Sequence, residues 1–208
     1  MVADMNRRSS AASFGGSVRP GACALLAAAF VLAGCSGPAP ATFDLSAPRE
    51  VTGAARIGGD QLIVTEPLAL QTLDGNAIIV KGSDGSVSQL EGVQWADRLP
   101  KLVQTRLIQT FENGSRLGRV ARPGEGVVAN YALGTEIRHF EISSASSEAV
   151  VEISARLIET LSGRVVSARL FSARVPVNGI TGPNAARALD EALSSVLLQI
   201  VRWSPARA

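Results

Sequence analysis

The segment Ala149-Val150-Val151-Glu152-Ile153-Ser154-Ala155-Arg156-Leu157-Ile158-Glu159-Thr160 determines the fold that we predict for this chain. Apolar and polar residues alternate along it, with Val151, Ile153, Ala155 and Leu157 on one face and Glu152, Ser154 and Arg156 on the other. A period of two residues indicates a β-strand with one buried face. The segment is therefore predicted to be a strand lying on an apolar core.

Two more long strands are predicted on either side of this one, over residues 128–142 and 165–177. The connections between the three strands are short and polar, namely Ser143-Ser144-Ala145-Ser146-Ser147 and Leu161-Ser162-Gly163-Arg164. Connections of this length join neighbouring antiparallel strands. The three strands are therefore expected to form an antiparallel meander.

A helix is predicted over residues 99–111, where the apolar residues recur at helical spacing. Its apolar face consists of Leu99, Leu102, Val103, Leu107 and Phe111. Asp97 is the expected N-cap, Pro100 falls in the first turn, and Asn113-Gly114 is the expected stop.

A second helix is predicted from Asn184 to Trp203, at the end of the chain. Its apolar stripe consists of Leu189, Leu193, Val196, Ile200 and Trp203. Arg187, Asp190 and Glu191 exclude a membrane span, so the helix is expected to pack on the sheet.

The first half of the chain is predicted to contain four short strands, at residues 42–45, 61–64, 77–81 and 87–95. Residues 51–60 form a loop, and Ser83-Asp84-Gly85-Ser86 is a hairpin turn. The predicted fold class is α+β, a single domain with a largely antiparallel sheet and two amphipathic helices packed on it.

The N-terminus resembles a bacterial lipoprotein signal peptide. A basic segment precedes the apolar run from Ala22 to Ala33, and the run ends in Leu32-Ala33-Gly34-Cys35. The run is too short for a membrane span, which needs about 20 residues. The resemblance implies cleavage after residue 34, acylation of Cys35 by fatty acids such as palmitate, and a lipid-anchored chain.

Residues 35–41 are small and rich in proline, so we expect them to be a lipidated tether ahead of a domain over residues 42–208. Fully extended, the tether after Cys35 spans about 20 Å. Ser36, rather than Asp, follows the cysteine. By analogy with enteric lipoproteins, this favours the outer membrane, facing the periplasm, over the inner membrane.

The net charge of +2 arises from the signal peptide, which carries Arg7, Arg8, Arg19 and Asp4. The remaining chain is neutral, which argues against a nucleic-acid partner or a polybasic membrane patch. Its other cysteine, Cys23, also lies before the cleavage site, so no disulfide is expected.

The search for catalytic chemistry finds no nucleophile elbow, Walker sequence or dinucleotide fingerprint. His139 is the single histidine and is set in a strand, which excludes His-based metal clusters. Nothing pairs the carboxylates in a cleft, although a two-carboxylate hydrolase is a distant alternative. We therefore predict no enzymatic activity, no cofactor and no metal.

The mature chain resembles the ABC-type transport auxiliary lipoprotein family along its whole length. The most specific match is Trp95-Ala96-Asp97-Arg98-Leu99-Pro100. The other matching stretches include Phe43-Asp44-Leu45, Leu62-Ile63-Val64-Thr65-Glu66-Pro67, Arg122-Pro123-Gly124-Glu125-Gly126, Tyr131-Ala132-Leu133, Glu136-Ile137-Arg138 and residues 188–203. One departure is Asn113-Gly114-Ser115-Arg116, which affects only a turn.

This resemblance implies a non-catalytic lipoprotein subunit of an ABC transport system that moves lipids or sterols across the cell envelope. Its implied partner is the MCE-domain protein of that system, with the ATPase and the permease contacted indirectly, and with a lipid ligand and a homo-oligomer also expected. The alternative is an envelope assembly factor or pilotin-like lipoprotein that stabilises another machine.

The candidate partner contacts are Trp95, Asp97, Arg98, Arg122 and Glu125. For residues 95–100 a purely structural role, as strand end, cap and helix start, is the competing interpretation. For residues 122–126 a docking loop and a simple turn are equally supported by the sequence.

Overall fold

The computed structural model of the protein describes residues 38–51, 60–116 and 119–204. The chain divides into two units, Met1–Ala39 and Pro40–Ala208, and the helices and strands given below all lie in the second. The predicted signal peptide and Cys35 lie outside the described residues.

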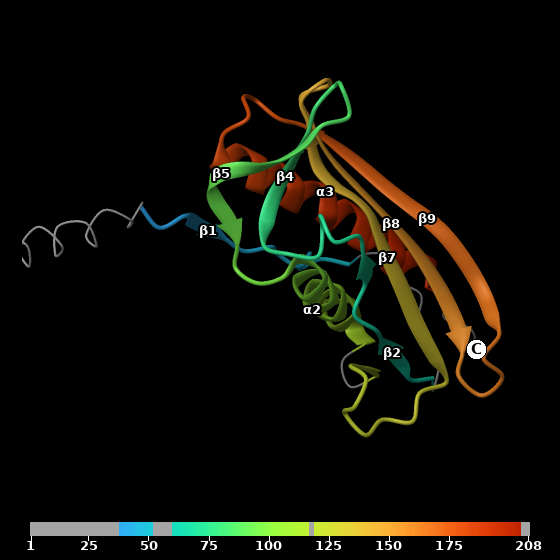
Figure 1. Ribbon diagram of the computed structural model, residues 1–208. Coiled ribbons are helices and arrows are strands. Elements are labelled where there is room, and N and C mark those ends of the chain that lie inside the picture. Colours follow the sequence, from blue (N-terminus) through green and yellow to red (C-terminus); the bar gives the residue numbers. More distant parts are fainter. Residues whose placement is uncertain (1–37, 52–59, 117–118, 205–208) are drawn as a thin grey trace, which may run out of the picture. The chain divides into compact units, whose positions relative to one another are not determined.

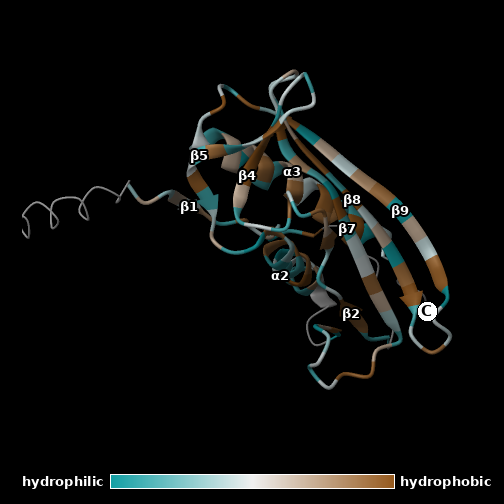
Figure 2. Ribbon diagram, viewed as in Figure 1, coloured by the Kyte–Doolittle hydropathy of each residue, from teal (hydrophilic) through white to brown (hydrophobic). Residues whose placement is uncertain are grey.

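Three long strands form the antiparallel meander predicted from the sequence (Figure 1). They are β7 (Tyr131–Ser143), β8 (Glu148–Glu159) and β9 (Val165–Pro176). Hydrophobic and hydrophilic residues alternate along them (Figure 2). Because the period is two, one face of the meander packs on the core and the other stays open.

The strands on the other side of β7 make the sheet mixed. They are β1 (Ala41–Phe43), β2 (Leu62–Val64), β3 (Leu68–Ala69), β4 (Ala77–Lys81), β5 (Val87–Trp95) and β6 (Val120–Ala121). Strands β2, β3 and β4 all pair with β7 in parallel. The parallel pairs also include β1 with β5 and β2 with β6.

The prediction of a largely antiparallel sheet was therefore wrong. It rested on short connections, which specify only hairpins such as β4–β5 and the meander. Between β5 and β7 the chain makes a long crossover through the helix α2 (Leu99–Phe111), and this crossover brings β7 parallel to β4.

The helix α3 (Gly182–Trp203) packs across β8 and β9, while α2 contacts α3, β2 and β6 (Figure 1). Four residues of the predicted stripe of α3 are fully buried, namely Leu189, Leu193, Val196 and Ile200. The fifth, Trp203, is half-buried and meets Phe171 edge-on at 5.4 Å between ring centroids. In the described part of the chain, neither helix has the length and apolar character required to cross a membrane.

Both predicted ends of α2 differ from the structure, although its predicted range is confirmed. The N-cap residue is Arg98, and no side chain caps the helix there. At the other end Asn113-Gly114 does not stop the helix, which continues as the π-helical turn η1 (Glu112–Arg116). The Asn113 side chain instead donates a hydrogen bond to the carbonyl oxygen of Pro48 at 2.8 Å.

The buried stripe of α3 gives a stability prediction. Truncation of Leu193 or Ile200 to Ala should lower the free energy of unfolding by about 2–5 kcal/mol, because each leaves a cavity at a fully buried position. Arg187→Ala, at an exposed position of the same helix, should cost less than about 0.5 kcal/mol. Urea denaturation measures all three, and equal losses would contradict the assigned face.

Candidate functional site

A pocket forms where the chain leaves β7 between β2 and β3. Residues Val64 and Leu68 both lie in ladder positions on β7, opposite Leu133 and Glu136. The three residues 65–67 therefore lie opposite only two residues of β7, Gly134 and Thr135. Pro67, in this segment, has no N–H to donate to the strand ladder. The segment between the two short strands swings away from β7 at this point.

One backbone and two side-chain hydrogen bonds hold residues Val64 and Thr65 where the ladder between this segment and β7 is interrupted. Both the N–H and the hydroxyl of Thr65 donate to the carbonyl oxygen of Leu133 at 3.1 Å. The buried side-chain amide of Gln104 on α2 donates to the carbonyl oxygen of Val64 at 3.0 Å. These bonds fix the departing segment in place, so the pocket is a built feature of the sheet.

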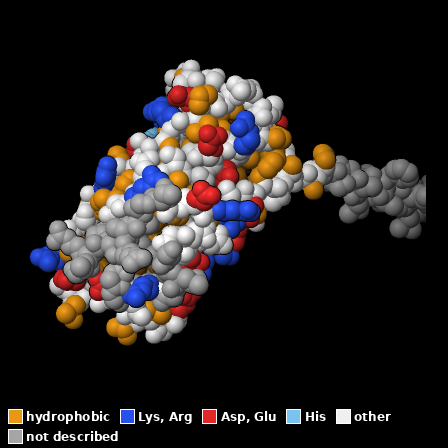
Figure 3. Space-filling view, turned by 180° about the vertical axis from the view of Figure 1, so that it is seen from behind, with side chains coloured by type: hydrophobic (Ala, Val, Ile, Leu, Met, Phe, Trp, Pro, Cys, Tyr) orange, Lys and Arg blue, Asp and Glu red, His pale blue; other side chains and the backbone are white. Residues whose placement is uncertain are grey.

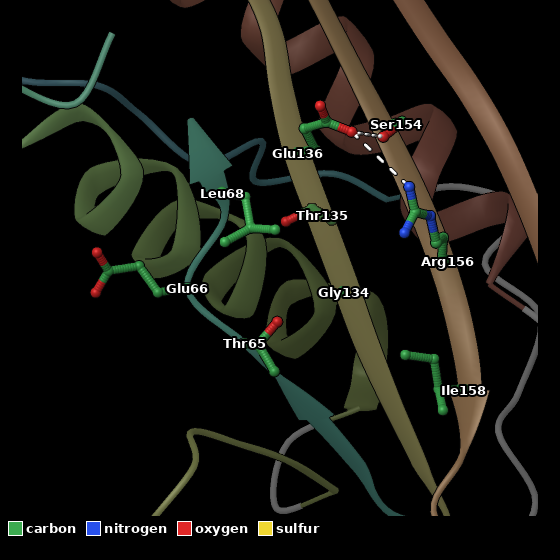
Figure 4. Close-up of a pocket in the computed structure, with 9 residues that line it drawn as sticks. All are labelled: Thr65, Glu66, Leu68, Gly134, Thr135, Glu136, Ser154, Arg156 and Ile158. Atoms are coloured by element: carbon green, nitrogen blue, oxygen red, sulfur yellow. Dashed lines mark hydrogen bonds and ion pairs between the residues drawn. The ribbon is translucent and has the colours of Figure 1, made fainter. Parts of the chain in front are cut away.

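The pocket has a volume of about 330 Å³ and opens over Gly134 (Figure 4). Leu68 borders it on one side, and Arg156 and Ile158 of β8 border it on the other. A Cβ atom added at Gly134 would meet only the Cδ1 atom of Ile158, at 3.9 Å. The absence of a side chain at residue 134 therefore keeps this space open.

Next to Gly134, the side chain of Thr135 lies on the core-facing side of β7. Thr135 is 4 % exposed, and Figure 4 shows its oxygen pointing toward Leu68. Its Oγ1 atom has no hydrogen-bond partner among the described residues. A buried hydroxyl without a partner costs free energy.

Ion pairs flank the pocket on both sides. The carboxylate of Glu136 accepts a hydrogen bond from Ser154 at 3.1 Å and pairs with Arg138 at 3.8 Å and Arg156 at 4.0 Å. On the side of α2, Arg98 pairs with Glu66 at 3.1 Å and also with Asp74. Three carboxylates thus balance three guanidinium groups, so the surroundings of the pocket are neutral.

Two of the predicted contact residues, Asp97 and Arg98, lie at the start of α2. The hydrogen bond and charge of Asp74, together with the charge of Glu66, raise the pKa of Arg98 above its ordinary value. The ammonium of Lys101 lies 2.6 Å from Asp97, and its hydrogen bond, followed by that of the Arg98 N–H, holds the pKa of Asp97 below its ordinary value. Both side chains stay ionised at neutral pH.

Two others, Arg122 and Glu125, form a local turn that is tied to the same helix. Their side chains pair at 3.8 Å, and the N–H of Arg122 donates to the Glu125 carboxylate at 3.0 Å. The Arg122 guanidinium also donates to the hydroxyl of Thr105 on α2 at 3.3 Å. Thr105 follows Arg98 by seven residues, or about 10 Å along a helix.

These contacts define one surface along α2, consisting of Asp97, Arg98, Lys101, Arg122 and Glu125, which we call the α2 surface. The side chains of Arg98 and Glu125 are 49 % and 48 % exposed. Trp95 does not belong to it, because it is 1 % exposed and packs edge-on against Phe140 in the core. For Trp95 the structure therefore supports the structural interpretation.

The described residues hold little that resembles catalytic machinery. His139 lies with its Nδ1 atom 2.7 Å from the Oε1 atom of the buried Glu141. Across the part of the chain that the structure describes, no three His, Cys, Asp or Glu residues are grouped to hold a metal ion. Acidic and basic side chains are interspersed on the face seen in Figure 3, without a patch of one sign.

Sequence reasoning missed Gly134, Thr135 and Gln104. Gln104 lies outside the apolar face predicted for this helix but is buried at 7 % exposure, where its amide donates to the Val64 carbonyl oxygen. The one available signal was Thr135, a polar residue at a core-facing position between Leu133 and Ile137. The departure of residues 65–67 from β7 depends on pairing that the sequence did not specify.

Comparison with known proteins finds a family over most of the chain. The sequence model of the family described as ABC-type transport auxiliary lipoprotein component matches residues 43–201. An uncharacterized protein of Bradyrhizobium diazoefficiens is 30 % identical over 172 residues, which cover 81 % of this chain and 46 % of that protein. The chain thus spans about half the length of this curated relative.

Solved structures share the fold. A crystal structure of a protein from Xanthomonas campestris, of the family DUF330, matches with a TM-score of 0.73 at 25 % identity, covering 78 % of this chain and 93 % of that chain. The crystal structure of another uncharacterized protein matches with a TM-score of 0.63 at 14 % identity, covering 80 % and 99 % of the two chains. The second match supports the fold alone.

We predict that removal of the Thr135 hydroxyl stabilises the chain. Thr135→Val should raise the free energy of unfolding by about 1 kcal/mol, because it removes a buried polar group that lacks a partner. Thr110→Val is the matched control, since the buried Thr110 hydroxyl donates to the Arg106 carbonyl at 2.6 Å. This control should lower the free energy of unfolding by about the same amount.

Urea denaturation of both variants checks this prediction. If Thr135→Val destabilises the chain as Thr110→Val does, the Thr135 hydroxyl has a hydrogen-bond partner, which would contradict the prediction.

Proposed function

The chain belongs to the family of ABC-type transport auxiliary lipoprotein components, and we propose that it is the non-catalytic, periplasm-facing subunit of an ABC transport system that moves lipids or sterols. One observation carries this proposal beyond the family. The segments that carry the family resemblance meet in space, since Glu66 and Glu136 line one pocket and Arg98 of the α2 surface pairs with Glu66. A surface built from separated segments is suited to recognising a partner.

The anchor in this proposal is acylated Cys35, which becomes the first residue of the mature chain. The tether up to Ala41 is short, so the domain stays within about 20 Å of the membrane that holds it. Its partner therefore has to approach the same membrane. Ser36 favours the outer membrane as the membrane that holds the chain.

The proposed partner is the MCE-domain protein of the transport system, bound through the α2 surface. Balanced ion pairs on the rim of an interface contribute more to specificity and to the rate of association than to affinity. The exposed pairs Asp97–Lys101 and Arg122–Glu125 fit this role. Binding as a homo-oligomer would present several such surfaces to one partner.

Anchoring is tested at the cysteine. Cys35→Ser should abolish acylation and leave unprocessed precursor in the inner membrane, because the thiol alone accepts the diacylglycerol. Labelling of cells with a radioactive fatty acid measures this, and undiminished label in the variant protein would contradict the lipoprotein assignment.

Docking is tested by site-specific photo-crosslinking in membranes. A crosslinker at Arg98 or Glu125 should capture the MCE-domain protein, because both side chains are exposed on the α2 surface. A crosslinker at Ser172, which is exposed on β9 and separated from β3 by β7 and β8, is the control and should capture little of it.

The transport proposal would fail on two results together. The first is that crosslinkers at Arg98 and at Glu125 both fail to capture an MCE-domain protein, and the second is that deletion of the gene leaves envelope lipids and detergent sensitivity unchanged. The assembly-factor alternative would then replace it.

A further inference from the structure

Strand β9 has one free edge. Its 12 residues, Val165–Pro176, pair with β8 on one side, and no other strand of the described chain pairs with them (Figure 1). Just beyond β9, the N–H of Val177 donates to the carbonyl oxygen of Ser147, on the β8 side, at 2.8 Å. Because the direction of bonding alternates along a strand, the N–H and C=O groups of residues 168, 170, 172 and 174 point away from β8. They are available to another strand.

Proline and strand irregularity, two features that block pairing at a sheet edge, occur in β9 only near its ends. Pro176 closes the strand, and the register shift between β8 and β9 lies at Val166. Between them the edge is regular, and Leu170 at its centre is 47 % exposed. The carbonyl oxygen of Ser172 accepts one long hydrogen bond, from the side-chain amide of Gln199 at 3.4 Å. A regular and partly apolar edge of this length is a template for an added strand.

The two arginines of β9 restrict which strand can be added. Arg174 pairs with Glu148 at 3.3 Å, and the guanidinium of Arg169 lies 5.4 Å from the centroid of the Phe171 ring. Both cations thus have a partner in their own chain and do not require an acidic residue opposite them. A second copy of β9 running parallel would place each arginine beside its own copy, which is destabilising. An antiparallel copy avoids this.

The sequence of β9 fits an antiparallel copy of itself in one register. When Ala168 lies opposite Arg174 of the second copy, Arg169 lies opposite Ala173 of the second copy. Each arginine then faces an alanine, no two arginines are opposite or diagonal neighbours, and residues 166–176 all overlap. A shift by two residues either places Arg169 diagonally beside its own copy or shortens the overlap.

The lipid anchor favours a second copy over a strand from a soluble protein. An antiparallel pair of identical strands has its two-fold axis perpendicular to the sheet, so both copies turn the same face to the same side. Two chains held in one membrane by acylated Cys35 can therefore pair while both anchors stay inserted. Confinement to one membrane surface also raises the effective concentration of each copy for the other.

We propose that two copies of the chain form a symmetric dimer in which the free edges of their β9 strands pair antiparallel, with Ala168 opposite Arg174 and Leu170 opposite Ser172. The sheet then continues from one copy into the other. The inference rests on the homo-oligomer of the proposed function and specifies its interface. Both α2 surfaces of such a dimer face the same side and are available to one partner.

Disulfide crosslinking of the full chain in cell membranes tests this pairing. A chain that carries both Ala168→Cys and Arg174→Cys places thiols opposite each other in the dimer, with Cα atoms about 5.5 Å apart, within the range for a disulfide. In one chain the two positions are about 20 Å apart along the strand and cannot join. Oxidation by copper phenanthroline should give a covalent dimer, measured by non-reducing gel electrophoresis.

The two single variants are the matched controls. Ala168→Cys alone or Arg174→Cys alone leaves its two thiols about 20 Å apart in the dimer, so each should give at least about tenfold less covalent dimer. The wild-type chain reports any dimer that forms through Cys35.

A charge at the centre of the edge tests the pairing independently. Leu170→Lys, added to the double variant, places two like charges in the interface and should lower the yield of covalent dimer about tenfold. Leu161→Lys changes a leucine that is 98 % exposed in the turn after β8, and should leave the yield unchanged. Urea denaturation checks that both variants remain folded.

Three results would overturn the proposal. They are equal yields from the double variant and the single variants, no covalent dimer from the double variant, and a yield that Leu170→Lys leaves intact. If the double variant stays monomeric while crosslinkers at Arg98 and Glu125 still capture the MCE-domain protein, the dimer interface is wrong and the proposed partner stands. Failure here is therefore distinguishable from failure of the proposed function.

Discussion

The pairing of β7 along both of its edges is the constraint on which the rest of the structure depends. One edge pairs with β8 along its whole length, with one register shift between Ile137 and His139, and the other edge is divided among β2, β3 and β4. Its core-facing residues Leu133 and Ile137 are almost fully buried. A strand held in this way cannot shift its register without moving every core side chain to the open face. The helices pack on a sheet that is fixed by this strand.

The candidate site arises at the edge of β7 that pairs with the short strands β2 and β3. Two very short strands meet β7 with mismatched spacing, and the chain between them departs at residues 65–67. Side chains take over the missing ladder bonds, so the irregularity is stable. The pocket therefore lies where the pairing along one edge of β7 is interrupted, and hydrogen bonds from Thr65 and Gln104 hold the neighbouring segment in place. A binding site on such a framework needs little rearrangement when it is occupied.

Much of the fold could be predicted because its long elements carry strong periodic patterns. The meander and the ranges of α2 and α3 follow from alternation and from helical stripes, as Ile153 and Leu193 illustrate. The mixed topology could not be predicted in this way, because β2 and β3 have only three and two residues and their partners are far away in the sequence. Arg98 was a candidate contact because its motif is specific, yet its ion pairs with Glu66 and Asp74 depend on that unpredicted topology. Trp95 belongs to the same motif and serves the core.

We propose that the chain is a binding subunit whose chemistry is recognition. Its most direct test is affinity purification of the native assembly through a tag on this chain, with quantification of every copurifying protein by mass spectrometry. The account predicts an ABC ATPase, its permease and an MCE-domain protein in fixed ratio to the lipoprotein. Enrichment of components of a secretion or surface-polymer machine, without an ABC ATPase, would contradict it.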